Sequence, residues 1–246
     1  MLLLAAGAGC ETAPPTRQQV LERILPSSVQ IVIEQREGRR VRSGSGVAIA
    51  ARRNGGAPEC IVLTAGHTLS GLVDRVSIFT LFGRQNGTGT KVPATIVTHA
   101  DNAELDVAVL SAATDCSPAV ATGPPVLGDS VWVVAFPWGG YMTLATGVVS
   151  QIRLKNAPAG EPPSRFMIDA LVGYGASGSG VYQASTGRLL GIVEGYGTAR
   201  VAGQGATPGW YIDIPMPGQT FVTPLSDVQR YLRKAGHGDL LAIASE

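Results

Sequence analysis

The chain has 246 residues and a mass of 25.4 kDa, with 45% hydrophobic and 15% charged residues. This much apolar material can form a core and excludes a wholly disordered chain. The formal net charge of +1 gives no global electrostatic field, which argues against nucleic acid and anionic membranes as partners. The 32 glycines and 16 prolines indicate many short elements joined by tight turns.

The first ten residues form a short apolar run that ends in small residues and Cys10. The run is shorter than the ~20 residues of a membrane-spanning helix, and no basic segment precedes it. Together with the polar, proline-containing residues 11–16, it resembles the signal and tether of a bacterial lipoprotein. The resemblance implies an exported protein, periplasmic or at the cell surface, whose only membrane contact is a lipid on Cys10. The alternative is a disordered N-terminal tail.

Short runs rich in Val, Ile and Thr recur along the chain and are bounded by Gly, Pro and Asn, a pattern typical of β-strands. Turn signals occur at residues 54–56, 86–89, 156–163 and 215–218. The proline-rich residues 117–125 divide the runs into two groups of six. The pattern therefore predicts an all-β protein of two packed six-stranded β-barrels. The predicted strands are residues 29–34, 46–51, 60–65, 76–81, 94–98, 107–110, 130–135, 141–152, 166–171, 180–183, 189–194 and 220–222.

Two short helices are predicted. Residues 17–25 form an amphipathic lead-in, and residues 226–235 begin with a Ser/Asp pair and end at Gly236. The resulting organisation has five parts: a signal-like segment with tether and lead-in at 1–26, an N-terminal barrel at 27–116, a linker at 117–125, a C-terminal barrel with its helix at 126–236, and a frayed tail at 237–246.

Three polar residues occupy positions that suit a chemical role better than a purely structural one. His67 follows an apolar strand in a glycine-flanked turn, a fixed yet open place suited to a general base. Asp106 begins an apolar strand, where a carboxylate needs a partner such as an imidazole. Ser177 lies among four glycines in residues 173–180, in a loop that leaves room for a substrate. The alternatives are a polar strand end, a turn cap and a flexible hairpin.

The order His67, Asp106, Ser177 carries more information than any one of the three residues. The first two fall in the first group of strands and the serine in the second, so the predicted site lies in the cleft between the barrels. A hydroxyl, an imidazole and a carboxylate brought together form the unit that activates a serine nucleophile. The amide N–H groups of Gly175 and Ser177 are predicted to bind the developing oxyanion.

Several motifs resemble those of the trypsin-like serine peptidases, in particular the HtrA/Deg branch, over roughly residues 27–233. These motifs are residues 43–47 (SGSGV), 63–67 (LTAGH), 106–110 (DVAVL), 133–139, 147–150, 175–181 (GASGSGV) and 221–225. The resemblance implies the double-barrel chymotrypsin fold, with His67 as the base, Asp106 as the group that orients it, and Ser177 as the nucleophile. Too few residues follow Arg233 for a PDZ domain.

The resemblance also implies a function: a serine endopeptidase that cleaves protein or peptide substrates through an acyl-enzyme and needs no metal or cofactor. Ala176 and Ser179 depart from the family pattern, which usually has Asn before the nucleophile and Gly-Pro further on. The alternative is a catalytically inactive protein of the same fold that binds peptides or partner proteins.

The walls of the substrate pocket are predicted around residues 168–172 and 192–197. Leu171, Val193, Glu194 and Tyr196 are the predicted substrate-binding residues, and Glu194 would favour a basic substrate side chain. The alternative is that Glu194 and Tyr196 are loop residues without this role.

Setting Cys10 aside leaves Cys60 and Cys116. In the barrel implied by the resemblance, both lie at the end away from the cleft, on neighbouring strands. An oxidising compartment would permit a disulfide between them, and we predict this bond. The alternative is two independent buried thiols.

Overall fold

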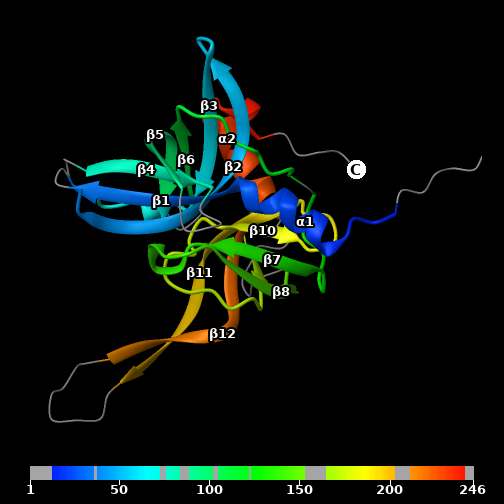
Figure 1. Cartoon of the computed structure of the whole chain (residues 1–246). Helices are drawn as coiled ribbons and strands as arrows, with labels where there is room; N and C mark the ends of the chain where they lie inside the picture. Colours follow the sequence, from blue (N-terminus) through cyan, green and yellow to red (C-terminus); the bar gives the residue numbers. More distant parts are fainter. Residues whose placement is uncertain are drawn as a thin grey trace, which may run out of the picture.

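Figure 1 shows the fold as a computed structural model, in which two β-barrels pack against each other. The structure describes residues 13–35, 38–72, 76–83, 89–101, 105–121, 123–152, 165–202 and 211–241. The predicted lipidation site Cys10 and the turn signal at 156–163 lie outside these residues, as does most of the signal at 86–89.

The first barrel consists of six antiparallel strands in the spatial order β1-β2-β3-β6-β5-β4 and closes where β1 pairs with β4. Alternate residues of β1, such as Val29 and Ile31, point into its interior, the alternation that a half-buried strand requires. The strands are β1(Ser28–Gln35), β2(Arg40–Asn54), β3(Ala57–Thr64), β4(Val76–Phe82), β5(Thr90–Asp101) and β6(Asp106–Ala112).

The second barrel repeats the arrangement with the order β10-β11-β12-β9-β8-β7, and it closes where β10 pairs with β7. Its interior holds Phe166, Ile168 and Val222, among other buried residues. The strands are β7(Ser130–Ala135), β8(Thr143–Gln151), β9(Phe166–Ile168), β10(Gly180–Gln183), β11(Leu189–Ala202) and β12(Tyr211–Pro224). The predicted all-β double barrel is confirmed, and each of the twelve predicted strands overlaps an observed one.

Strands β11 and β12 are much longer than predicted and continue beyond the barrel as a two-stranded hairpin (Figure 1). The turn predicted at residues 215–218 is wrong, because these residues belong to β12. The pairing is nevertheless interrupted there: Thr220 pairs with Tyr196 but Pro215 with Thr198, so residues 216–219 lie opposite Gly197. The proline and glycine signal therefore marks a bulge at the base of the hairpin.

A third apolar cluster joins the barrels. Ile61 and Leu63 of the first barrel and Val134 and Ile192 of the second belong to it, together with residues of both helices. Helix α1(Arg17–Ile24) begins with a capping box, in which Thr16 and Gln19 each accept a hydrogen bond from the other's backbone N–H.

Helix α2(Leu225–Lys234) follows β12 and returns to the first barrel, where the Tyr231 and Thr98 hydroxyls are 2.5 Å apart. It starts one residue earlier than predicted, with Pro224 rather than a Ser/Asp pair at its N-cap. The predicted frayed tail is wrong for Leu240 and Leu241, which are buried in the cluster between the barrels. None of the described helices is long and apolar enough to cross a membrane.

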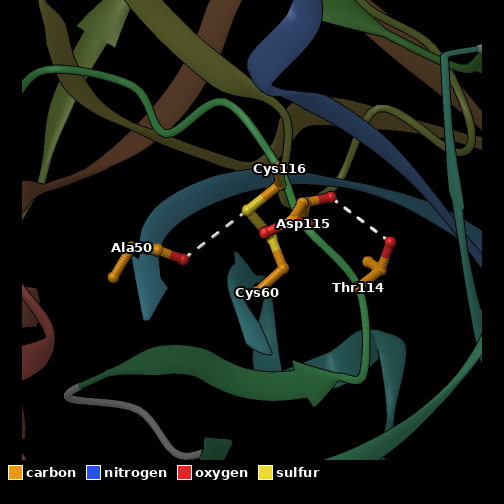
Figure 2. The surroundings of a disulfide bond; sticks show 5 residues. All are labelled: Ala50, Cys60, Thr114, Asp115 and Cys116. Atoms are coloured by element: carbon orange, nitrogen blue, oxygen red, sulfur yellow. Dashed lines mark hydrogen bonds between the residues drawn. A yellow bond between two sulfur atoms is a disulfide. The ribbon is translucent and has the colours of Figure 1, made fainter. Parts of the chain in front are cut away.

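Cys60 of β3 and Cys116 after β6 form a disulfide at the end of the first barrel (Figure 2). Their Cα atoms are 5.7 Å apart, within the range that disulfides span. Cys60 is fully buried, and the Cys116 Sγ lies 3.6 Å from the Ala50 carbonyl oxygen on β2. The bond therefore fixes the segment that leaves β6 against the β2–β3 hairpin.

The double substitution Cys60→Ala and Cys116→Ala is expected to lower the free energy of unfolding by about 4 kcal/mol. This figure is the loop-closure entropy for a sequence separation of 56 residues. Urea unfolding of the variant and of the oxidised and reduced wild-type protein measures it. Equal midpoints for the oxidised and reduced wild type would contradict the prediction.

Candidate active site

His67 is placed at the rim of the first barrel by the end of β3. The strand stops at Thr64, and residues Gly66–Thr68 form a single 3₁₀ turn, η2, that carries the imidazole. The Arg42 guanidinium, from β2, donates to the carbonyl oxygens of His67, Thr68 and Ser70 at 3.1, 3.1 and 2.7 Å. These bonds satisfy carbonyls at the end of the turn and hold it in place.

Asp106 is the first residue of β6, and it is 4% exposed. One carboxylate oxygen accepts a hydrogen bond from the His67 backbone N–H at 2.6 Å, and the other lies 2.6 Å from His67 Nδ1. The buried charge is thereby satisfied by two donors of one residue. Because a carboxylate only accepts, the arrangement places the Nδ1 proton toward Asp106 and leaves Nε2 as the acceptor.

Ser177 comes from the second barrel, in the loop that connects β9 to β10. Its Oγ lies 2.9 Å from His67 Nε2, on the side of the ring opposite Asp106. The three side chains predicted from the sequence therefore lie together across the boundary between the barrels. The distances match those of a nucleophile held by a base, which is itself held by an orienting carboxylate.

The Ser177 loop is folded by backbone hydrogen bonds to β11. Gly178 N–H donates to the Val193 carbonyl at 2.7 Å, and Val193 N–H donates to the Ser179 carbonyl at 2.9 Å. Gly175 and Gly178 have φ values of +88° and +85°, which side chains with a Cβ rarely adopt. In the described part of the chain, the amides of Gly175 and Ser177 donate to no protein acceptor. Both N–H groups are free to bind a substrate oxygen.

Ser45 of β2 joins this loop to the first barrel. Its Oγ donates to the Gly175 carbonyl at 2.7 Å and accepts from Phe136 N–H at 2.9 Å, while its own N–H donates to the Ser177 carbonyl at 2.9 Å. Gly178 packs so closely that a Cβ there would collide with the Ser45 carbonyl. Ser45 thus holds the Ser177 loop against β2 of the first barrel.

The pKa of His67 is raised above its ordinary value, chiefly because Asp106 accepts a hydrogen bond from the ring. Partial burial of the imidazole acts in the opposite direction and lowers its pKa. The negative charges of Asp106, Asp101 and Glu194 raise it further. A raised pKa makes the imidazole a stronger base. Only its neutral form can accept the Ser177 proton.

Glu194 is the extra residue of a bulge in β11, because Val193 pairs with Val222 and Gly195 with Phe221. Its carboxylate lies 2.6 Å from the Arg165 guanidinium, just before β9. Burial raises the pKa of Glu194, and Arg165 partly offsets this shift. The charge that was predicted to select a basic substrate is therefore already paired within the protein.

The other predicted substrate-binding residues occupy different environments. Leu171 is 72% exposed, and Tyr196 is half-buried on β11. Val193 offers no exposed side chain to a substrate: the side chain is fully buried in the second barrel, and the backbone holds the Ser177 loop. Alternation along β11 turns Val193 into the second barrel and Ile192 into the cluster between the barrels.

Trp138, in the 3₁₀ turn η4(Pro137–Gly139) after β7, was not predicted to belong to the site. Its φ of +55° makes it the non-glycine residue with a left-handed backbone among the described residues. Such a conformation costs on the order of 1–3 kcal/mol and persists where surrounding contacts impose it. Here Trp138 N–H donates to the Tyr174 carbonyl at 2.7 Å, so the turn is bonded directly to the Ser177 loop.

Known proteins share this fold and its motifs. A match to the trypsin-like peptidase domain covers residues 44–192, more than half of the chain. The serine endoprotease from Yersinia pestis superposes with a TM-score of 0.62 at 22% identity, over 90% of this chain and 67% of that one. Deg5 superposes with a TM-score of 0.62 at 21% identity, over 89% and 95%. No curated protein sequence matches the chain. The chain belongs to the family of trypsin-like peptidase domains.

Proposed function

We propose that the chain is a serine endopeptidase that cleaves peptide bonds through Ser177, His67 and Asp106. The observation that carries the proposal is the hydrogen-bonded series across the barrels, 2.9 Å from Ser177 Oγ to His67 Nε2 and 2.6 Å from Nδ1 to Asp106. Membership of the peptidase family supports the same function and a peptide or protein substrate.

In the acylation step, His67 Nε2 accepts the Ser177 proton while Oγ attacks the carbonyl carbon of the scissile bond. Asp106 stabilises the imidazolium that forms, since it already accepts two hydrogen bonds from His67. The carbonyl oxygen becomes an oxyanion, and the free N–H groups of Gly175 and Ser177 are the donors that would stabilise it. Their pre-set positions avoid reorganisation during the reaction.

The tetrahedral intermediate collapses when His67 donates its proton to the leaving amine, and the acyl group stays on Ser177 Oγ. A water molecule then gives its proton to His67 and attacks the ester carbon. His67 finally returns a proton to Ser177 Oγ, which releases the acid and restores the starting state. Every proton passes through His67 Nε2, which exchanges it with Ser177 Oγ at 2.9 Å, with the leaving amine or with the attacking water.

Two measurements on the purified chain test the proposal. A fluorophosphonate probe reports whether the Ser177 hydroxyl is activated, and an internally quenched peptide library reports cleavage. We expect covalent labelling at Ser177 and a new peptide end for each cleaved substrate. A folded protein that neither reacts with the probe nor cleaves any peptide would instead be the inactive, peptide-binding form of the fold.

The negative charge of Glu194 is expected to affect the acid limb of the pH profile of kcat/KM, because it raises the pKa of His67. Activity falls as pH falls through the pKa of His67, because the protonated ring cannot accept the Ser177 proton. Glu194→Gln removes a negative charge that raises this pKa. The acid limb of the profile therefore moves to lower pH.

The matched control is Glu34→Gln, which removes a carboxylate paired with Lys91 on the first barrel. Its acid limb should coincide with that of the wild type. A Glu194→Gln profile that moves to higher pH, or does not move, contradicts the prediction.

We also propose that the protein functions in an oxidising compartment, as an exported protein that is periplasmic or at the cell surface. The Cys60–Cys116 disulfide supports this location, because such bonds persist outside the reducing cytosol. Cell fractionation of the expressing organism, with labelled palmitate to detect a lipid on Cys10, tests both the compartment and the anchor.

A further inference from the structure

Three aromatic side chains lie next to one another at the Ser177 loop: Tyr174 belongs to the loop, and Trp138 and Tyr196 come from neighbouring segments. The ring centroids of Trp138 and Tyr174 are 5.1 Å apart, and Tyr174 meets Tyr196 edge-on at 6.3 Å. We call these three residues the aromatic strip. Trp138 is 75% exposed and Tyr174 66%. Large rings left in water forgo their hydrophobic stabilisation, so an exposed cluster of them is typical of a surface that binds something.

The strip is attached to the groups around Ser177. Tyr174 directly precedes Gly175, whose N–H is free, and its carbonyl accepts the Trp138 N–H. A Cβ on Gly175 would lie 2.8 Å from both the Phe136 carbonyl oxygen and the Trp138 nitrogen, which shows how closely the two segments pack. The backbone segments that carry Trp138 and Tyr174 are therefore fixed relative to the nucleophile.

The backbone of Trp138 gives a second and independent indication. This residue combines a left-handed φ of +55° with a ring that is 75% exposed. Neither property favours folding, and a glycine would relieve the unfavourable conformation. A conformation of this kind, maintained by its surroundings, is typical of residues that position a ligand.

We propose that the aromatic strip binds large apolar side chains of the polypeptide substrate, aromatic ones above all, within a few residues of the scissile bond. The inference rests on the proposed function and names the substrates that the same site prefers. Uncharged rings bind such side chains by stacking and by excluding water. Tyr174 is the central ring, three residues before Ser177, and it contacts both Trp138 and Tyr196.

A pair of matched peptides tests the preference. Two internally quenched decapeptides differ only in the residues that flank the cleaved bond, which are Phe in one and Gln in the other. The ratio of their kcat/KM values measures discrimination, and fluorophosphonate titration gives the concentration of active Ser177 in each preparation. The wild-type protein is expected to favour the Phe peptide by roughly 10- to 100-fold, the range that apolar pockets provide.

Trp138→Ala and Tyr196→Ala are each expected to reduce this ratio at least threefold, mainly by raising KM for the Phe peptide. Trp138→Phe keeps a ring at the same place and should restore most of the discrimination. Tyr211→Ala is the matched control, because Tyr211 is an exposed tyrosine on the distant part of the β11–β12 hairpin. It should leave the ratio unchanged.

The outcomes separate this inference from the proposed function. Labelling at Ser177 with equal cleavage of both peptides overturns the inference and leaves the peptidase standing. Absence of labelling and of cleavage overturns the proposed function. If Trp138→Ala keeps the discrimination but lowers the mass in sedimentation velocity, the strip is a contact between copies of the chain, and the substrate inference is wrong.

Discussion

Ser177→Ala is expected to lower kcat for peptide cleavage by ~10⁴-fold or more and to abolish fluorophosphonate labelling. The substitution removes the Oγ that lies 2.9 Å from His67 Nε2, and with it the only step that forms the acyl-enzyme. Rates on an internally quenched peptide, compared with thermal unfolding of both proteins, separate lost chemistry from lost structure. His67→Ala should have an effect of the same size, because the two residues act as one unit.

Ser179→Ala provides the control for this experiment. Ser179 lies two residues further along the same loop, but its side chain is fully buried and donates to the Ala176 carbonyl. It has no path to a substrate, so the variant should still react with the probe. Labelling that persists in Ser177→Ala and disappears in Ser179→Ala would show that the nucleophile is Ser179 and that the assignment to Ser177 is wrong.

The sequence predicts the barrels well because their signals are local. Alternating apolar residues, such as Val29 and Ile31, reveal a strand wherever one face is buried. The ends of β11 and β12 were not predicted because the hairpin beyond the barrel has exposed apolar residues on both strands, such as Val201 and Ile212. Proline and glycine at 215–218 mark a bulge as readily as a turn, so the pattern alone does not distinguish them.

For the site, the chemical types predicted three residues but not those that position them. His67, Asp106 and Ser177 carry the functional groups of nucleophilic catalysis, and this is the signal that identifies them in the sequence. Ser45, which bonds to the Ser177 loop, and Arg165, which pairs with Glu194, carry no such signal, because their partners lie 130 and 29 residues away in the chain. Trp138 was hidden for another reason: its importance comes from a backbone angle and from exposure, and neither can be derived from composition.

Asp106→Asn is expected to lower kcat at neutral pH by ~10⁴-fold while the fold is retained. Asp106 accepts from two donors of His67, the backbone N–H and Nδ1–H. An amide has one acceptor, so its NH₂ group must face one of the two positions. The imidazole then turns to the tautomer with its proton on Nε2, which presents a donor to Ser177 where an acceptor is required.

Asp101→Asn is the matched control for this variant. Asp101 pairs with Asp106 across β5 and β6 and raises the pKa of His67 by its charge alone. Its loss should move the acid limb of kcat/KM to lower pH and leave the maximal rate within a few-fold of wild type. Profiles of kcat and kcat/KM between pH 5 and 10 for both variants test these two predictions. A maximal rate for Asp106→Asn within tenfold of wild type would mean that the carboxylate holds the turn in place without orienting the base.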